Sequence, residues 1–453
     1  MMTPARTPAP RNVRLFIFFR AAFNARFYYP VFTILFLDLG LTLEQFAVLN
    51  AVWAATIVAL EVPLGALADV FGRRRLVVLA AALMVVEMGL LCTAPRGRPA
   101  LLFAVMLLNR VLSGAAEAAA SGADEAIAYD SLKQAGREDE WPRVLERQMR
   151  IQALATIGAV VVGAAAFDAD FLGALAAALG LGLRLPPETT LRLPLVLSLL
   201  SALVALGCAM GLREDPGDRG SGNGADIRQA VRGTLAAGRW ILATPFALAA
   251  IAAGMLFDNC IRMVITLASQ YYRMIGLPEA VYGLVGAGLA VLGLVTPRLA
   301  SAMARRWSPL TNFLIMAGGA LAGLSALPLF LPVTGLLPMA LLFAVMYLNH
   351  FFQSHYLNRL SASHHRATIL SFKGLAFNLA YGLVGLAYSV LVALLRERTL
   401  APAGPGPSIQ DLAFMHSLIF FPGYFLAGAL AVVWIGWVQL GKTSDRPHAR
   451  PWR

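Results

Sequence analysis

Residues 65 to 75 read GALADVFGRRR and join two long apolar runs, 44 to 66 and 75 to 94. A helix of about twenty residues is long enough to cross the hydrocarbon core of a bilayer, about 30 Å thick. The consecutive arginines between the runs would be costly in hydrocarbon, so they mark a turn at a membrane surface. The stretch therefore predicts a helical hairpin in an integral membrane protein.

The same alternation of apolar runs and polar turns continues along all 453 residues. Charged residues make up only 14% of the chain, against roughly 25% in a soluble domain, so we exclude a soluble fold. The net charge of +12 does not indicate nucleic-acid binding, because Lys and Arg lie in turns rather than on one soluble face. We expect an all-α membrane protein with about twelve transmembrane helices, over 13–38, 44–66, 75–94, 100–129, 148–168, 191–212, 240–267, 278–300, 309–331, 336–358, 367–395 and 411–440.

Basic residues are distributed unequally between alternate turns. Cytoplasmic loops of membrane proteins are enriched in Lys and Arg, so the basic turns predict a multi-pass protein of the cell inner membrane with both termini cytoplasmic. Such a topology needs an even number of spans, and we interpret 168–194 as an external loop with an interfacial piece rather than a further span. The predicted cytoplasmic side holds the basic residues of 73–75, 133–150, 213–239, 305–306, 359–366 and 442–453.

One interior break divides the chain. Residues 213 to 238 are polar, rich in Gly and too hydrophilic to cross a membrane. They predict a six-helix bundle over 1–212, a cytoplasmic linker over 213–239, and a second six-helix bundle with a short tail over 240–453. This layout is typical of secondary transporters, whose solute site lies near the midplane between two repeats.

The turn at 65 to 75 resembles the GxxxDxxGRRR signature of the major facilitator superfamily. A small residue permits close helix approach, a carboxylate at a helix end accepts hydrogen bonds, and a glycine permits a tight turn. The alternative interpretation is a plain positively charged turn. The resemblance implies two pseudo-symmetric six-helix halves and a conformational latch formed by Gly65, Asp69, Gly72, Arg73 and Arg74.

A second stretch, LNRVLSGAA at 108 to 116, is similar to the RxxQGxxAA pattern of the same family, with Ser113 where Gln is usual. In that pattern the Arg is associated with proton coupling, which implies this role for Arg110. Glu117 and Asp124 follow at intervals of seven, so on one continuous helix the three would share a face. Charges at membrane depth usually face a partner or a wet cavity, and a buried structural ion pair is the alternative.

The first predicted helix carries Arg20, Asn24 and Arg26. Arg20 and Asn24 are four residues apart and share a face. An arginine at the depth of Arg26 suits either an anionic solute or a countercharge for Glu117.

In the second half, Asp258 and Arg262 have the spacing of an intrahelical ion pair, which is either structural or part of the solute site. His350 and His355 lie on the tenth predicted helix. A histidine can relay protons near neutral pH, or it can simply form hydrogen bonds in packing.

These patterns predict a secondary active transporter that moves a small organic solute by alternating access, with proton-coupled export as the leading mode. Drug antiporters of this family usually carry a GP-containing signature in the fifth helix. Residues 157–167, IGAVVVGAAAF, have no proline, which argues against a multidrug exporter and leaves metabolite uptake by symport or uniport open.

A membrane-embedded enzyme or a solute receptor on the same scaffold is the alternative from another class. The sequence has no HExxH, no metal-spaced Cys/His cluster and no Ser/His/Asp set, and its loops are too short for a signalling domain. We therefore expect a non-enzyme with no cofactor, metal or nucleic-acid partner. The expected partners are a small solute, protons and the lipid bilayer, and the expected state is a monomer.

Overall fold

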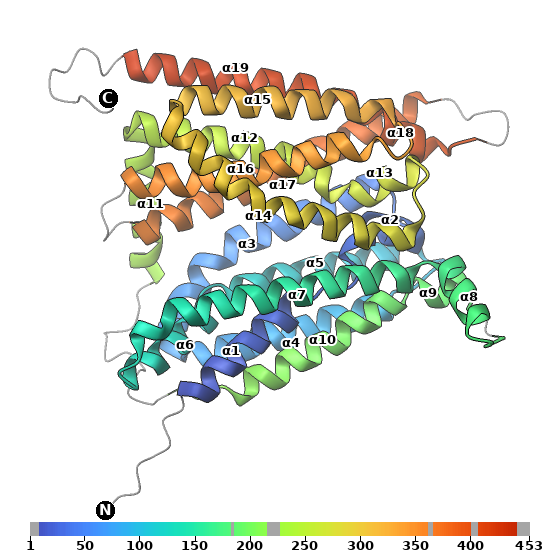
Figure 1. The fold of residues 1–453 in the computed structure, drawn as a ribbon, viewed down its shortest axis with the longest axis horizontal. Coiled ribbons are helices and arrows are strands. Elements are labelled where there is room, and N and C mark those ends of the chain that lie inside the picture. The colour runs from blue at the N-terminus through green and yellow to red at the C-terminus, as the bar shows by residue number, and fades with distance from the viewer. Residues whose placement is uncertain (1–8, 183–184, 215–226, 361–365, 400–405, 442–453) are drawn as a thin grey trace, which may run out of the picture. The chain divides into compact units, whose positions relative to one another are not determined.

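The computed structural model describes residues 9–182, 185–214, 227–360, 366–399 and 406–441, and every regular element in these ranges is helical (Figure 1). Eleven helical stretches there are long and apolar enough to cross a membrane. They are built on α3 (Leu43–Phe71), α4 (Arg73–Cys92), α5 (Pro99–Ala120), α7 (Trp141–Phe167), α10 (Leu193–Gly211), α12 (Pro245–Thr266), α14 (Tyr282–Arg306), α15 (Pro309–Ala326), α16 (Leu336–Leu360), α17 (Arg366–Arg398) and α19 (Phe420–Gly441).

The first predicted span, 13–38, is not one helix. It is divided into α1 (Ala9–Asn24), a 3-10 turn at Tyr29–Val31, and α2 (Phe32–Leu39). Neither α1 nor α2 is long enough to cross a bilayer alone, which is why this span does not count among the eleven. The expectation of a continuous first helix was wrong, and the total of about twelve spans is reached by taking α1 and α2 together.

The chain forms two compact units. Unit 1 comprises residues 1–231 together with 277–287, and unit 2 comprises 232–276 and 288–453. In unit 1, α4 packs against α5 and α10, and α3 packs against α5. In unit 2, α12 packs against α16, α17 and α19. The segment 277–287 thus lies between the two stretches of unit 2 in the sequence but belongs to unit 1.

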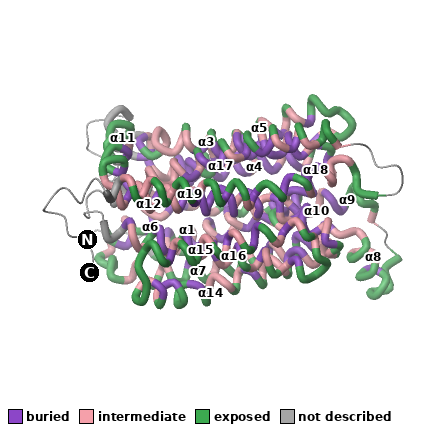
Figure 2. Tube along the Cα trace, turned by 90° about the horizontal axis from the view of Figure 1, so that it is seen from above, coloured by how far each residue is buried: buried purple, intermediate pink, exposed green. Residues whose placement is uncertain are grey.

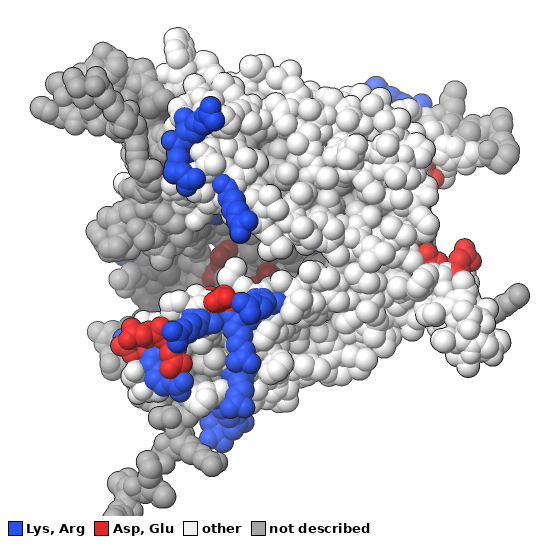
Figure 3. All heavy atoms as spheres, in the orientation of Figure 1, with Lys and Arg blue, Asp and Glu red and all other residues white. Residues whose placement is uncertain are grey.

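Small residues allow the helices of each unit to approach closely. Ala202, Ala205 and Ala209 on α10 are all fully buried and recur at three- and four-residue spacing along one face. Helices in a membrane associate mainly through such close packing, because hydrocarbon solvates apolar side chains as well as a protein interior does. On the face drawn in Figure 3, charged side chains gather towards the helix ends, with a broad band of uncharged side chains between them.

The two predicted loop regions contain helix. In 168–194 the structure places α8 (Ala169–Ala178) and α9 (Pro187–Thr190), and the ten residues of α8 are too few to cross a membrane. In the predicted linker, 215–226 lie outside the described residues, but α11 begins at Ile227 and continues to Ala243, so 227–238 is helix rather than loop. Figure 2 shows that α8 and α11 are largely exposed.

Shorter helices connect the long ones, including 3-10 turns at Glu138–Glu140 and Leu327–Leu329. A break after α5 separates it from α6 (Ala123–Gln134), and α13 (Ala268–Met274) directly follows α12. Two more, a 3-10 turn at Glu279–Val281 and α18 (Ile409–Leu418), precede α14 and α19. The predicted C-terminal tail from 442 onward lies outside the described residues.

Candidate functional site

The break between α1 and α2 sets the geometry of unit 1. α1 ends at Asn24, and Pro30 lies in the 3-10 turn before α2. Proline has no N–H, so it could not donate the bond to residue 26 that one continuous helix would need. The backbone groups released at the break are bonded by α10: Ser198 Oγ accepts from the N–H of Phe27 at 3.0 Å, and Ser201 Oγ donates to the carbonyl of Ala22 at 2.9 Å. Hydroxyls of neighbouring helices commonly stabilise interrupted membrane helices in this way.

A glycine of α7 lies against the same break. A Cβ added at Gly163 would stand 1.7 Å from the carbonyl oxygen of Phe27, so only glycine fits there. The break is therefore supported by residues of two helices, α7 and α10, that lie far from it in sequence.

Arg26 lies in the break and forms an ion pair with Glu87 of α4. Both side chains are buried, and Asn109 of α5 donates to the backbone carbonyl of Glu87 at 2.8 Å. The sequence offered an anionic solute or Glu117 as the partner of Arg26. The structure gives it a third partner, the carboxylate of Glu87, in a direct ion pair.

Arg110 of α5 is buried without a carboxylate partner in the described part of the chain. Its guanidinium donates to Oδ1 of Asn109 at 3.0 and 2.8 Å. It also lies over the rings of Phe32 and Phe36 on α2, 5.4 and 5.2 Å from their centroids. Two aromatic faces and an amide oxygen thus compensate this charge.

Glu117, on the same helix, has neither the burial of Arg110 nor its polar contacts in the described part of the chain. Its side chain is exposed, and the structure records no hydrogen bond or ion pair for it within the described residues. Arg26, Glu87, Arg20 and Asp124 are near enough to act on it electrostatically. Arg110 and Glu117 therefore do not form a structural ion pair.

Asp124 belongs to a separate helix. α5 ends at Ala120, and Gly122 takes a positive φ of 74° before α6 begins, so the predicted continuous ladder of Arg110, Glu117 and Asp124 is interrupted. Asp124 is buried and pairs with Arg20 of α1, with distances of 2.5 Å to Nε and 3.0 Å to Nη2. Asn24 donates to the backbone carbonyl of Arg20 at 2.8 Å, in the last turn of α1.

The turn between α3 and α4 is held by two carboxylates from elsewhere in unit 1. Glu214 accepts from the backbone N–H groups of Arg73 and Arg74 at 2.8 and 3.3 Å, at the N-terminus of α4. Asp130 of α6 forms an ion pair with Arg73, and Arg74 donates to the carbonyl of Met210. Negative charge is favourable at a helix N-terminus.

The glycines of this turn have different surroundings. Gly72 has a φ of 92°, and a Cβ there would meet Glu214 Oε2 at 2.7 Å. A Cβ at Gly65 would meet nothing within 4 Å, so the close approach predicted for Gly65 is not seen inside unit 1. Asp69 belongs to α3, but the structure does not describe its side chain.

Unit 2 carries its own polar set. Asp258 and Arg262 form the ion pair that their spacing predicted. Arg262 also donates to Asn378 of α17 at 3.0 Å and lies 5.0 Å from the ring centroid of Tyr381. His350 of α16 places Nε2 4.0 Å from Oδ1 of Asp258.

The two histidines do not lie together. His350 has a side chain that is 56% exposed, whereas His355 is stacked on Phe351 with ring centroids 5.8 Å apart. His350 is thus the one of these two histidines that the structure records beside Asp258.

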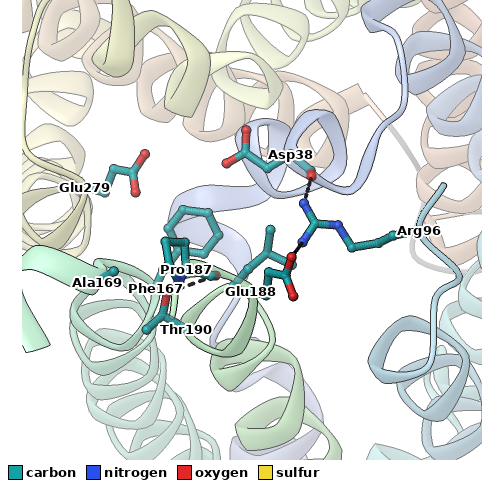
Figure 4. A pocket seen from close by; sticks show the side chains of 9 residues that line it. Asp38, Arg96, Phe167, Ala169, Pro187, Glu188, Thr190 and Glu279 are labelled. Atoms are coloured by element: carbon teal, nitrogen blue, oxygen red, sulfur yellow. Dashed lines mark hydrogen bonds and ion pairs between the residues drawn. The ribbon is translucent and has the colours of Figure 1, made fainter. Parts of the chain in front are cut away.

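At the other end of unit 1, a pocket of about 320 Å³ is lined by residues of α2, α7, α9 and the 277–287 segment. Arg96 donates to the backbone carbonyl of Asp38 at 3.1 Å and lies 3.8 Å from Glu188, as Figure 4 shows. Glu279 lines the opposite wall.

The sequence was compared with models of protein families. The model described as Major Facilitator Superfamily matches residues 14–385. The chain belongs to the major facilitator superfamily. The resemblance seen in the two sequence motifs and the predicted fold class are therefore confirmed, and this is a multi-pass membrane transporter.

Solved structures of major facilitator transporters share the fold. A bacterial homologue of the human lysosomal transporter Spinster, inward-facing and unoccupied, is 16% identical with a TM-score of 0.71, over 96% of this chain and 98% of that one. The nucleoside transporter NupG is 12% identical with a TM-score of 0.66, over 94% and 98%. A bacterial homologue of the iron transporter ferroportin, inward-facing, is 15% identical with a TM-score of 0.66, over 94% and 99%. A search of curated protein sequences finds no match.

Sequence reasoning missed several partners in this major facilitator transporter. Glu87, Asp130, Glu214 and Asn378 were given no role from the sequence. Glu87 is the single acid in the apolar run 75–94, and that was the available signal. No comparable signal marks Asn378, because an amide in a membrane helix is common in structural hydrogen bonds.

Proposed function

We propose that this transporter exports a small organic solute from the cytoplasm in exchange for protons, with Glu117 as the proton-carrying group. The observation that carries the proposal is an exposed carboxylate on a membrane-spanning helix with no hydrogen bond or ion pair in the described residues. A carboxylate that faces water can take up and release a proton as the water-filled space changes sides.

The surrounding carboxylates support this choice. Glu87 and Asp124 are each held by an arginine, and protonating either would leave that arginine buried or half-buried without its countercharge. Glu117 can change protonation without breaking such a pair. Arg110 lies seven residues before Glu117 on α5. Its contacts with the rings of Phe32 and Phe36 hold α5 against α2 and so position the helix that carries Glu117.

We assign solute contact to the polar set of unit 2. His350 is exposed, and Arg262 combines a charge, an amide partner and an aromatic neighbour. Such mixed polar and aromatic groups are typical of sites that orient small organic molecules. In unit 1, Arg20, Asn24 and Arg26 then support the break rather than bind the solute directly.

The turn residues Gly65, Asp69, Gly72, Arg73 and Arg74 are proposed as the conformational latch, and 213–239 as the cytoplasmic linker between the two bundles. The basic turns support an inner-membrane location with both termini cytoplasmic. Because one chain holds both bundles that alternating access requires, we propose that it acts as a monomer.

Proton-coupled uptake of a metabolite is the second candidate. It is favoured by the absence of proline from 157–167, the segment in which drug antiporters of this family usually carry a GP-containing signature. Uptake by symport would use the same carboxylate, but solute and proton would move in one direction.

The test uses energised inverted membrane vesicles with a pH-sensitive dye. Cationic drugs, organic anions, sugars, nucleosides and amino acids are added one at a time, with vesicles lacking the protein as the control. An exporter produces proton release from the vesicle lumen when its solute is added. A response that appears only in right-side-out vesicles, with solute and protons entering together, would replace export by uptake.

A further inference from the structure

A cavity of about 430 Å³ lies within unit 2, and neither Asp258, Arg262 nor His350 lines it. It is enclosed by α12, α15, α16 and α19, all of them in one compact unit. Its walls are mainly apolar, with Phe246, Phe257, Phe313 and Met316 among them. None of its lining residues is charged. A charged ligand would therefore find no countercharge there.

The mouth of the cavity is apolar and exposed. Trp437 is 76% exposed, Leu310 58% and Val433 40%. Exposed apolar side chains on membrane-spanning helices contact lipid chains, so a molecule can enter sideways from the bilayer. The lining residues begin near the starts of α12 and α15, close in sequence to Arg239, Arg305 and Arg306. Basic residues are enriched on the cytoplasmic side, so we place the mouth in the cytoplasmic leaflet.

Two amide side chains line this apolar space, and each leaves its oxygen without a hydrogen-bond partner in the described residues. Asn312 is 1% exposed and Gln353 is 4% exposed, and both line the cavity. Oδ1 of Asn312 and Oε1 of Gln353 are buried and have no hydrogen-bond partner in the described protein. A buried acceptor without a partner is unfavourable, so its presence needs an explanation.

The orientation of both amides follows from their other contacts. Gln353 Nε2 lies 2.7 Å from the carbonyl oxygen of Ala250, and a carbonyl can only accept, so this atom is the donor and Oε1 is the free acceptor. Asn312 Nδ2 lies 3.5 Å from the carbonyl oxygen of Trp307, which can only accept, and 3.0 Å from the hydroxyl of Tyr356, so Oδ1 is the free acceptor here too. Gly254 makes room for Gln353, because a Cβ there would be 2.3 Å from the Gln353 amide.

We propose that this cavity is a binding site for uncharged alkyl alcohols, such as the hydroxyl-bearing glycerides of the cytoplasmic leaflet. The alkyl chain fills the apolar space, and the hydroxyl donates to the amide oxygens of Gln353 and Asn312. Along α12 the lining runs from Phe246 to Phe257, roughly 16 Å at about 1.5 Å per residue, which matches a medium-length alkyl chain. The site is separate from the proposed proton and solute groups.

The test uses the full-length protein in lipid nanodiscs. A dodecanol analogue with a diazirine in its chain is photo-crosslinked, and the labelled peptides are found by mass spectrometry. We expect labels on the cavity-lining parts of α12, α15, α16 and α19. Dodecanol should compete, and dodecane should compete roughly tenfold less well, since it lacks the hydroxyl.

Two glycines of α19 supply an occluding variant and its control. A Cβ at either Gly436 or Gly423 would meet nothing within 4 Å, but only Gly436 lines the cavity. Gly436→Leu should abolish labelling, and Gly423→Leu should label as the wild type does. Gln353→Leu should remove the preference for dodecanol over dodecane.

Three results would overturn the proposal. These are equal competition by dodecanol and dodecane in the wild type, labelling that survives in Gly436→Leu, and an unchanged alcohol preference in Gln353→Leu. Equal competition would mean that lipid chains of any kind merely fill the space. If Gln353→Leu does not fold, Gly436→Leu and the two competitors still decide the question.

Discussion

Three arginines of unit 1 are stabilised in three different ways. Arg26 pairs with a buried carboxylate, Arg20 pairs with Asp124 at the start of α6, and Arg110 relies on an amide oxygen and two aromatic rings. Glu117 has no hydrogen bond or ion pair to any described residue. This difference in surroundings, rather than residue type, separates the structural charges from the one we assign to proton transfer.

The buried Arg26–Glu87 pair gives the first prediction. Arg26→Met should lower the free energy of unfolding by about 3–5 kcal/mol, because it leaves Glu87 charged and buried without its partner. The double variant Arg26→Met/Glu87→Met should recover most of that loss. Thermal unfolding of the purified protein in one detergent measures both, and equal damage in the single and double variants would contradict the assignment.

Sequence alone gave the charged residues at membrane depth but not their partners. Arg26 and Glu87 are 61 positions apart, and the pairing depends on how α4 packs beside the break in the first span. The Asp258–Arg262 pair was predictable because residues four apart in sequence are neighbours on the surface of one helix.

At the scale of the element, the interrupted first span is the main departure from the sequence expectation. Its apolar residues satisfy the length of a membrane helix, so a hydropathy pattern cannot reveal the break. The local signal is Pro30, and the stabilising groups come from Ser198, Ser201 and Gly163. These become visible only once α7 and α10 are placed.

The packing of α7 against this break predicts a difference between two glycines of one helix. Gly163→Ala should destabilise the protein by about 1–3 kcal/mol, since its Cβ would overlap the Phe27 carbonyl. Gly158→Ala should have no such cost, because a Cβ there meets nothing within 4 Å. Thermal unfolding separates them; similar melting temperatures for the two variants would argue against the close contact.

The cap of α4 gives a third prediction. Glu214→Ala removes the acceptor for the N–H groups of Arg73 and Arg74 and should cost about 1 kcal/mol of stability. Glu138→Ala, which changes an exposed acid in the turn before α7, is the matched control and should be neutral. Melting curves of both variants at low and high salt provide the check, and a neutral Glu214→Ala would show that the cap contributes nothing.

At the scale of the whole molecule, composition and periodicity were sufficient for the class of fold. Apolar runs of membrane length predicted the helical bundle, and the motifs at 65–75 and 108–116 indicated the family. The predicted linker was less accurate, since α11 occupies residues that the polar composition assigned to a loop. A Gly-rich polar sequence shows where a chain leaves the membrane, but an amphipathic helix can still begin inside such a sequence.

Topology can be tested with single cysteines in a variant that lacks Cys92, Cys208 and Cys260. Asp139→Cys lies in the turn before α7 and should react with a membrane-impermeant thiol reagent only after cells are permeabilised. Thr189→Cys in α9 should react in intact cells. The reverse pattern would invert the proposed orientation and, with it, the direction assigned to the vesicle assay.

The most direct test of the account compares Glu117→Gln with Glu61→Gln, which changes a half-buried acid on α3. Each protein is reconstituted into liposomes, and two activities are measured with the solute found in the vesicle screen: exchange without a proton gradient, and transport driven by one. We predict that Glu117→Gln keeps exchange but loses at least about tenfold of the gradient-driven transport, because glutamine cannot carry a proton. Glu61→Gln should keep both. Full gradient-driven transport by Glu117→Gln, or its loss in Glu61→Gln alone, would contradict the assignment of Glu117 as the proton carrier.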